Sequence, residues 1–493
     1  MGLVAETPSG ERPSAPGAYD VVVVGSGPGG LQAAYFLGRL GLHVAILSAD
    51  AAPGGAFLKW PIFERLLSWS KPEAPFEWGT REYEWYDHNS LLADEPELRA
   101  LVPAQMDRDF VVPSRAEMEA GMAAFAGGAR LPVRFGCTWE ATRREGDDLV
   151  LATSDGEYRC RAAVFALGVT EPWRSAIPGI EHVPHYADAG RPEDYEGRRV
   201  VVVGKRNSGF ELADGLLPWA RRIVLVSPRP VQTAVLAQAT VRVRYFQPLE
   251  DFSLGGGTFA VDAAIERIER QDGTWRVHAH GTTVPGPFVL EADEVIAATG
   301  FTTPLRDLPD LGVTTVGQGR IPSLSPYWRA APGIYFAGNA TQGAPGLRKH
   351  GSGSSSPAVH GFRYNARVLA LHLAETLFGR APARPALQRE ELVPFLLREL
   401  EAAPELWAQK GYLARVAALD PPRDEGIQPL QAFVDAAGPD AVAVAVEVDA
   451  AGTIYPSVYV RRGGRLRNVD LDPDRLNAFA GAPYGRALEA LVR

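Results

Sequence analysis

The chain has 493 residues, of which 46% are hydrophobic and 22% charged, a composition typical of a globular protein and unlike a disordered or fibrous one. Its 50 basic and 59 acidic residues give a net charge of −9 without long single-sign runs, which argues against a nucleic-acid or anionic-membrane surface. Only Cys137 and Cys160 occur, so a disulfide framework, a CxxC pair and a cysteine metal cluster are excluded. No apolar run reaches the roughly 20 residues of a membrane helix. We therefore expect about three structural units, a loose N-terminal arm and a cytoplasmic location.

The first predicted element is a strand at residues 21–24, where four consecutive valines suit a strand buried on both faces of a parallel sheet. The glycine-rich turn GSGPGG follows, and residues 31–40 continue with the apolar spacing of a helix. Glycines in such a turn permit close approach to a pyrophosphate, which the helix N-terminus binds; a tight turn without a ligand is the alternative. The predicted dinucleotide site consists of Gly25, Ser26, Gly27, Pro28, Gly29 and Gly30.

A second strand is predicted at residues 43–47, and an acidic residue at its end would bind an adenosine ribose. Ser48 stands where that acid is expected, and Asp50 follows two residues later. We favour Asp50 slightly as the ribose ligand, while an Asp50 that is merely solvated remains the alternative.

Residues 57–86 are unusually aromatic, with nine aromatic side chains in 30 residues against 9% in the whole chain. They include four of the tryptophans, Trp60, Trp69, Trp78 and Trp85. Two interpretations stay open. The segment is either a wall that excludes water from a cofactor and binds an organic substrate, or simply the packed core of an insertion.

A second strand, turn and helix pattern begins at residue 198 with the sequence RRVVVVGKRNSGFELA. Its middle glycine is replaced by Arg206, yet two cations beside a phosphate loop would still favour an anion. After the next predicted strand, residues 222–226, Arg229 stands where an arginine can clamp the 2′-phosphate of NADP, although it could also be a solvated loop residue. The predicted second site consists of Gly204, Lys205, Arg206, Asn207, Ser208, Gly209 and Arg229.

Two helix starts can be predicted from capping signals. Ser114 and Glu117 form the S-x-x-E capping box. Pro357, with Ser355 or Ser356 as the N-cap, predicts a helix over residues 358–377.

Beyond that helix, residues 378–388 are rich in proline and predict a linker. Residues 389–420 are expected to be helical, and residues 440–449 with 453–462 are expected to form a β-hairpin. This C-terminal region carries no catalytic motif. It would cover a substrate entrance, form a homodimer or bind a carrier protein, and the sequence does not choose between these roles.

With these two glycine motifs, residues 18–380 resemble the flavoproteins with two dinucleotide-binding domains, and within them the flavin-containing (class B) monooxygenases. Residues 54–57, GGAF, look like the GGxW loop that borders the flavin. Residues 165–168, FALG, and 298–301, ATGF, look like the paired turns where the chain passes between the two domains. Residues 334–339, IYFAGN, resemble the strand and turn that hold the FAD ribityl chain, with Asn339 in place of the usual Asp.

The resemblance implies an α/β fold with two Rossmann-like domains, to which the helical and hairpin patterns after the linker add a small α+β C-terminal domain. The FAD domain would comprise residues 18–170 and 300–380, the NADP domain residues 171–299, and the C-terminal domain residues 389–493. It also implies FAD and NADPH as cofactors. No metal is expected, because the nine histidines show no H-x-x-x-H or H-E-x-x-H spacing on a helix. The further cofactor-binding residues are Gly54, Gly55, Phe57, Thr299, Gly300, Gly338 and Asn339.

One departure weakens the assignment to a subfamily. The class B fingerprint F-x-G-x-x-x-H is partial, because His185 would be its histidine but Glu181 stands where its glycine should be. The pair His185-Tyr186 beside the second glycine motif is also similar to thioredoxin-reductase-like disulfide reductases, which need a reactive cysteine, a cysteine pair or a small thiol handled at the flavin.

The chemistry implied by the resemblance is hydride transfer from NADPH to FAD, then oxygenation of a small organic substrate by O2 through a flavin C4a-(hydro)peroxide. The helix after residue 357 would point its N-terminus at the flavin pyrimidine ring and stabilise negative charge there. An ordinary, well-capped surface helix is the alternative. The candidate catalytic residues are Asn89, to steady the oxygen adduct, and His350 and His360, as proton donors.

Two other functions remain open. One is a different FAD and NADP oxidoreductase, either an oxidase or a thiol-related reductase without CxxC. The other is a flavoprotein whose dinucleotides serve only structure or sensing, which Arg206 in the second loop would favour.

Overall fold

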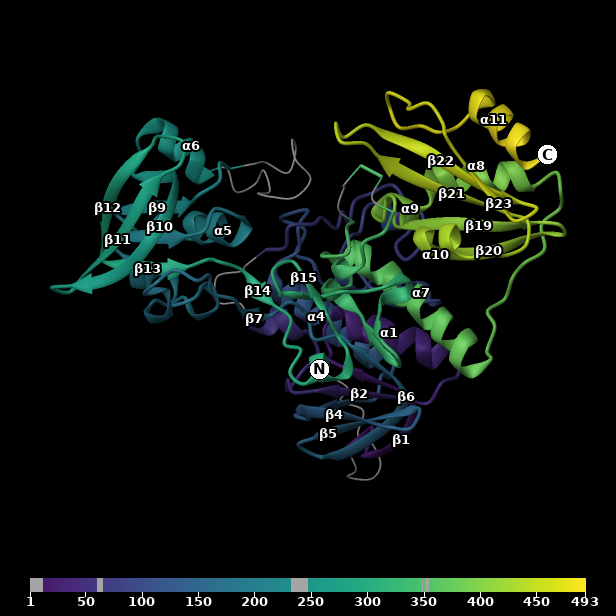
Figure 1. Ribbon diagram of the computed structural model, residues 1–493, viewed down its shortest axis with the longest axis horizontal. Helices are drawn as coiled ribbons and strands as arrows, with labels where there is room; N and C mark the ends of the chain where they lie inside the picture. Colours follow the sequence, from purple (N-terminus) through teal and green to yellow (C-terminus); the bar gives the residue numbers. More distant parts are fainter. Residues whose placement is uncertain (1–11, 60–64, 232–246, 348, 351–353) are drawn as a thin grey trace. The chain divides into compact units, whose positions relative to one another are not determined.

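The computed structural model describes residues 12–59, 65–231, 247–347, 349–350 and 354–493. The chain divides into two compact units, Met1–Phe57 with Ser68–Val169 and Thr303–Arg493, and Leu58–Leu67 with Thr170–Thr302. Figure 1 shows the chain coloured from purple at the N-terminus to yellow at the C-terminus. Each unit is built around its own sheet with a parallel core, and the first unit also carries an antiparallel sheet near the C-terminus.

The first unit is organised around a sheet with the strand order β17-β18-β6-β1-β2-β3, to which β5 and β4 add beyond β6. Strand β1 pairs in parallel with β2 and β6, as expected for a strand whose valines are wholly buried. The strands are β1 Gly17–Val24, β2 Val44–Ser48, β3 Val133–Phe135, β4 Trp139–Glu145, β5 Asp148–Thr153, β6 Gly156–Phe165, β17 Arg329–Ala331 and β18 Ile334–Phe336.

Helix α1 follows the first glycine turn and packs against α7, which comes more than 300 residues later in the sequence and is green in Figure 1. The predicted capping box is confirmed, because Ser114 and Glu117 exchange hydrogen bonds at the start of α4. The helices of this part are α1 Pro28–Arg39, α2 Pro96–Arg99, α3 Leu101–Gln105, α4 Arg115–Gly128 and α7 Val359–Phe378. Short 3-10 turns are η1 Gly55–Leu58, η2 Tyr83–Trp85, η7 Leu308–Leu311, η8 Pro326–Trp328 and η9 Gly338–Gly343, and a small strand pair is β15 Thr315–Val316 with β16 Ile321–Pro322.

The second unit has a sheet with the order β12-β11-β10-β9-β8-β13, in which β8, β9, β10 and β13 are parallel neighbours. Its strands are β8 Arg199–Val203, β9 Arg222–Ser227, β10 Thr258–Gln271, β11 Thr274–Gly281, β12 Gly286–Ala292 and β13 Glu294–Ala297. Its helices are α5 Asn207–Leu216 and α6 Gln247–Leu254, with η3 Ile180–His182, η4 Tyr186–Asp188 and η5 Pro192–Tyr195. The two-stranded pair β7 Glu171–Pro172 and β14 Phe301–Thr302 lies at its boundary with the first unit in the sequence.

The C-terminal region forms a five-stranded antiparallel sheet with the order β20-β19-β21-β22-β23. Its strands are β19 Leu413–Leu419, β20 Pro422–Pro429, β21 Ala441–Val448, β22 Ile454–Arg462 and β23 Arg465–Asp470. Its helices are α8 Leu392–Ala402, α9 Pro404–Ala408, α10 Leu430–Asp435 and α11 Ala482–Val492. Strand β21 is buried on both faces, since its valines pack towards α8 and α11 and its alanines towards α10.

The predicted fold class, two Rossmann-like units with an additional α+β region, is confirmed, and so is the hairpin of β21 and β22. The expectation that residues 389–420 are all helical is wrong for Leu413–Leu419, which pairs with β20 and β21 as a strand. Among the described residues, no helix combines the length and apolar character needed to cross a membrane.

Candidate active site

The first glycine turn requires glycine at both ends. Gly25 has a φ of +111°, and a Cβ atom there would lie 2.5 Å from the carbonyl oxygen of Ala166. A Cβ at Gly30 would lie 1.9 Å from the carbonyl oxygen of Gly25. At Gly27, which caps α1, the nearest atom to a Cβ would be 3.8 Å away. A Cβ at Gly27 would thus make only an ordinary van der Waals contact, and the α1 N-terminus beside it carries N–H groups that can bind an anionic phosphate.

The loop of Gly54 and Gly55 packs directly on this turn. The Gly54 N–H donates to the carbonyl oxygen of Ser26 at 3.1 Å. A Cβ at Gly55 would lie 3.0 Å from the Cα of Gly27, so the two backbones are in contact. Phe57, which follows in η1, is buried. The loop and the turn therefore border the same space, as the family resemblance implies.

The end of β2 distinguishes the two residues considered for the ribose. Ser48 is buried, its hydroxyl lies 2.7 Å from that of Ser26, and it accepts a hydrogen bond from the Asp50 N–H. Asp50 is partly exposed at the strand end. Because the Ser48 hydroxyl is used inside the fold, Asp50 stays the candidate ligand for the adenosine ribose.

The turn after β18 contributes the third part of this site. A Cβ at Gly29 would lie 2.3 Å from the Cα of Gly338, which itself has a φ of +74°. The next residue, Asn339, has a buried Oδ1 that accepts no hydrogen bond from the described residues. A buried acceptor without a donor is costly, so this oxygen is suited to a hydroxyl from a bound molecule. A phosphate cradle beside an acceptor for a polyol fits FAD.

The second glycine turn repeats the geometry of the first. A Cβ at Gly204 would lie 2.3 Å from the carbonyl oxygen of Ala298, and a Cβ at Gly209 would lie 2.4 Å from that of Gly204. Arg206, in place of the middle glycine, has an ordinary extended backbone and caps α5, which begins with Asn207 and Ser208. The turn therefore keeps the shape of a dinucleotide cradle without its middle glycine, which fits NADP(H).

Lys205 departs from the expected arrangement of two cations facing a phosphate. Its ammonium is buried, forms an ion pair with Asp262 and donates to the carbonyl oxygen of Val261 at 2.8 Å. Burial opposes ionisation of Asp262, but the hydrogen bond and charge of Lys205 outweigh it and lower the pKa of that carboxyl. Arg206 and Arg229 are exposed. Of the three predicted cationic ligands, Arg206 in this loop and Arg229 after β9 are thus the two that face solvent.

Thr299 and Gly300 hold the chain where it leaves β13. The Thr299 hydroxyl donates to the carbonyl oxygen of Trp173 at 2.5 Å, and the Gly300 carbonyl oxygen lies 3.0 Å from His185 Nε2. His185 is fully buried, which lowers its pKa, and its Nδ1 accepts from the Ala187 N–H. His185 is therefore neutral, with the proton on Nε2, and its role is to fix this turn.

The three candidate catalytic residues have different surroundings. The Asn89 amide is buried and donates to the Ser68 carbonyl oxygen and the Ser70 hydroxyl, both at 3.1 Å. His350 is exposed, and its Nε2 lies 2.7 Å from the hydroxyl of Tyr455 in β22. His360, the second residue of α7, stacks on another ring instead. Asn89 and His350 are thus engaged in contacts that anchor loops.

The ring that stacks on His360 is that of His88, with the two centroids 4.6 Å apart. Trp69 also packs on His88, again with centroids 4.6 Å apart. Trp69 is 41% exposed. A row of three rings, Trp69, His88 and His360, therefore leads from the surface to the first turn of α7. Sequence analysis did not identify His88, because nothing in its local spacing distinguishes it from the other histidines.

The prediction that Pro357 is the first residue of α7 is wrong by two residues. The helix begins at Val359 with Ala358 as the N-cap, and no side chain caps it. Ser356 is unavailable as a cap because its hydroxyl accepts hydrogen bonds from Asn365 and Gln409. Residues 351–353 of the same glycine- and serine-rich stretch lie outside the described residues.

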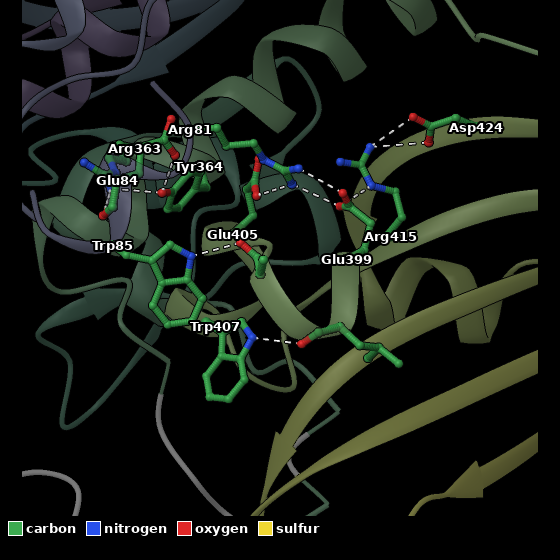
Figure 2. Close-up of polar contacts among 12 residues, drawn as sticks. Arg81, Glu84, Trp85, Arg363, Tyr364, Glu399, Glu405, Trp407, Arg415 and Asp424 are labelled. Carbon is green, nitrogen blue, oxygen red and sulfur yellow. Dashed lines mark hydrogen bonds and ion pairs between the residues drawn. The ribbon is translucent and has the colours of Figure 1, made fainter. Parts of the chain in front are cut away.

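Part of the aromatic segment packs away from the glycine turns. Trp85 donates to the carbonyl oxygen of Ala402 at 2.9 Å and packs on Trp407 with centroids 5.3 Å apart, as Figure 2 shows. Trp78 donates to the carbonyl oxygen of Pro72. Trp85 therefore packs on the C-terminal helices, while Trp60 lies outside the described residues.

Both cysteines are unsuited to redox chemistry. Cys137 and Cys160 are buried, and burial raises the pKa of both thiols, that of Cys160 to about 12. A protonated, inaccessible thiol is a poor nucleophile. The described residues also contain no group of three histidine, cysteine or carboxylate side chains placed to bind a metal ion.

The chain matches the pyridine nucleotide-disulphide oxidoreductase family over residues 22–338. It is 26% identical to FAD-dependent oxidoreductase domain-containing protein 2 of Danio rerio, over 84% of this chain and 68% of that protein. It is also 26% identical to the ferredoxin–NADP reductase of Thermus thermophilus, over 65% of this chain and 84% of that one. Among solved structures, a flavin-containing monooxygenase from Stenotrophomonas maltophilia superposes with a TM-score of 0.55 and 23% identity, covering 73% of this chain and 99% of that one. This last likeness establishes the fold.

Proposed function

The chain belongs to the pyridine nucleotide-disulphide oxidoreductase family, with FAD and NADP(H) as cofactors, and from this we propose that it is an NADPH-dependent monooxygenase. It would oxygenate a small organic molecule at nitrogen, at sulfur or beside a carbonyl. In the balanced reaction, one substrate molecule, one O2, one NADPH and one proton give one oxygenated product, one water and one NADP⁺. Domain boundaries, a homodimer and a cytoplasmic location remain predictions.

The burial of both cysteines carries the proposal. Disulfide reductases of this fold that relay electrons through their own cysteines need a reactive thiol, and both cysteines of this chain are buried. Electrons that reach FAD must therefore leave it directly for an external acceptor. O2 is the acceptor that the similarity to flavin monooxygenases favours.

When bound, FAD supplies hydride acceptance from NADPH and activation of O2. The chain's own residues bind and orient it. The turn from Gly25 to Gly30 offers backbone N–H groups to the pyrophosphate, and Asn339 offers its free Oδ1 to a ribityl hydroxyl. Arg206 and Arg229 would hold the phosphates of NADPH.

The row of Trp69, His88 and His360 supports the proposal that the substrate is an organic molecule. Aromatic rings bind an apolar molecule and exclude water, and a histidine at the first turn of α7 can hold or release a proton. We infer that His360 donates a proton to the oxygen atom of O2 that leaves as water. His350, hydrogen-bonded to Tyr455, is the weaker of the two candidates because it contacts the C-terminal sheet.

A second candidate function is a reductase that passes electrons to an external protein or small acceptor. The similarity to ferredoxin–NADP reductases favours it, since it covers 84% of the Thermus protein. Such an enzyme would reduce ferredoxin or ferricyanide with NADPH and would not incorporate oxygen into any product.

Turnover under 18O2 distinguishes the two functions. An organic sulfide, a tertiary amine and a cyclic ketone would each be incubated with NADPH, catalase and the purified protein. The proposal expects one 18O atom in a product, with one NADPH consumed for each product formed. Fast ferricyanide reduction without label in any product would support the reductase and reject the monooxygenase.

A further inference from the structure

Gln409 of the C-terminal region reaches into the first turns of α7. It follows α9, is fully buried, and its Nε2 lies 2.6 Å from Asn365 Oδ1 and 3.1 Å from both the Ser356 hydroxyl and the Gly361 carbonyl oxygen. One side chain of the C-terminal region therefore connects three groups at the start of the helix that we expect to face the flavin.

Asn365 continues this connection towards the glycine turns. Its Nδ2 donates to the hydroxyl of Thr341 at 3.0 Å, and that hydroxyl donates to the carbonyl oxygen of Gly338 at 2.6 Å. Gly338 is in backbone contact with Gly29, as described above. A chain of buried polar contacts thus runs from Gln409 through Asn365 and Thr341 to the turn that carries Gly338 and Asn339.

A second attachment holds the segment between η9 and α7. The Lys349 ammonium lies 2.8 Å from Asp470 Oδ1 and 2.7 Å from Asn468 Oδ1, both on β23. Leu347 packs on the core beneath the C-terminal sheet, and a Cβ at Gly346 would lie 2.7 Å from the Tyr412 ring. The C-terminal sheet therefore holds both this segment and the helix that follows it.

A third attachment joins the C-terminal helices to the aromatic segment. The Arg81 guanidinium forms ion pairs with Glu399 of α8 at 2.9 Å and Glu405 of α9 at 2.8 Å, and Arg415 of β19 pairs with the same Glu399 (Figure 2). Both glutamates are buried. With this ion-pair cluster, all three attachments lie within the first unit.

We propose that the C-terminal region is a structural component of the FAD site and that Gln409 is a positioning residue for the turn carrying Gly338 and Asn339. The physical reason is that buried amides must keep their partners. Without the Gln409 amide, Asn365 and Ser356 lose partners and shift, and Thr341 loses the neighbour that orients it. The inference rests on FAD as the cofactor and is independent of whether the substrate is oxygenated.

The test compares Gln409→Leu with Gln428→Leu. Leucine fills similar space but donates no hydrogen bond. The Gln428 side chain, also in the C-terminal sheet, donates to the nearby Glu425 carbonyl oxygen and to no other side chain or backbone group among the described residues. The readout is the FAD dissociation constant, from the flavin fluorescence of apoprotein titrated with FAD, without NADPH, substrate or turnover. We expect the FAD affinity of Gln409→Leu to be about 10-fold weaker than that of the wild type, which corresponds to the loss of one or two buried hydrogen bonds. The FAD affinity of Gln428→Leu should be unchanged.

A double-mutant cycle separates positioning from a general loss of packing. Thr341→Val removes the hydroxyl at the far end of the same chain of contacts. If that chain positions the turn, the double variant Gln409→Leu/Thr341→Val binds FAD no more weakly than the worse single variant. Fully additive losses, or an FAD affinity of Gln409→Leu within about twofold of the wild type, would overturn the proposal.

If Gln409→Leu does not fold, Gln409→Asn takes its place in the cycle, because it keeps the amide but withdraws it by one methylene. Loss of FAD affinity without loss of thermal stability in the apoprotein then supports positioning. Equal FAD affinity in the folded Asn variant rejects it. Neither result depends on oxygen incorporation, so a failure here is distinct from a failure of the monooxygenase assignment.

Discussion

A Cβ atom on Gly29 would lie 2.3 Å from the Cα of Gly338, more than 300 residues later in the chain. The turn after β1 and the turn after β18 thus meet backbone to backbone, next to the Asn339 Oδ1, which accepts no hydrogen bond from the described part of the chain. The predicted FAD site depends on this contact.

Gly29→Ala should therefore abolish FAD binding and lower the unfolding free energy by about 3 kcal/mol, because the methyl group overlaps backbone that cannot move aside. Gly38→Ala is the matched control, since it lies in the same helix with no atom within 4 Å of its Cβ. That variant should gain about 0.5–1 kcal/mol and keep its flavin. Urea unfolding and flavin content measure both effects, and an FAD-replete Gly29→Ala would refute the contact.

Arg229→Ala should raise KM for NADPH by about 10-fold or more and leave KM for NADH unchanged. The reason is that only NADPH carries the 2′-phosphate that this exposed arginine would clamp. Steady-state oxidation of the two nucleotides measures this. Equal effects on both would show that Arg229 does not read the 2′-phosphate.

Lys205→Met should differ from Arg229→Ala, because it should lower stability and leave KM for NADPH nearly unchanged. The ammonium of Lys205 is paired with Asp262 inside the second unit, so its removal leaves a carboxylate with no cation. We expect lower thermal stability and little change in KM for NADPH, measured on the same preparations. A large rise in KM with unchanged stability would restore Lys205 to the phosphate site.

Arg81→Met should destabilise the protein by about 3 kcal/mol at neutral pH, because it leaves Glu405 and Glu399 buried with fewer cations. Arg115→Met, which breaks a helix pair with Glu119, should cost about 0.5 kcal/mol. Urea unfolding at several pH values measures both. An Arg81→Met deficit no larger than that of Arg115→Met would argue that the cluster does not stabilise the fold.

The same cluster predicts the pH dependence. Burial opposes ionisation of Glu399 and Glu405, but the hydrogen bonds and charges of Arg81 and Arg415 outweigh it and lower the pKa of both carboxyls. Their contribution is therefore present above the unfolded pKa near about 4.3 and is lost as the pH falls through the lower folded values. Without Arg81 burial prevails, so the deficit of Arg81→Met should be largest at pH 8 and shrink towards pH 5.

The double variant Cys137→Ala/Cys160→Ala should keep its turnover per flavin within about twofold of the wild type, because neither buried, protonated thiol takes part in electron transfer. NADPH oxidation per bound FAD measures this. A loss of turnover with normal flavin content would favour the thiol-related reductase.

Local patterns predicted much of the first site. The valine run, the glycines and the capping box of Ser114 and Glu117 act over a few residues, so their geometry follows from nearby sequence. Strand Leu413–Leu419 was missed because its partners, β20 and β21, define it more than its own pattern does.

The same reason explains the misassigned polar residues. Lys205 faces Asp262, 57 positions away, and Ser356 is held by Gln409, 53 positions away, so neither performs the local role that its motif suggests. Gln409 itself carries no motif. Its importance appears only where α9, α7 and η9 come together in the fold.

The most direct test of the central claim is an anaerobic titration of the purified protein with NADPH, followed by the flavin absorbance near about 450 nm. An FAD-dependent, NADPH-consuming oxidoreductase should be yellow and lose this absorbance after one equivalent of NADPH per flavin, then recover it when O2 is admitted. A colourless protein that cannot be reconstituted with FAD, or a flavin that NADPH leaves oxidised, would contradict the account.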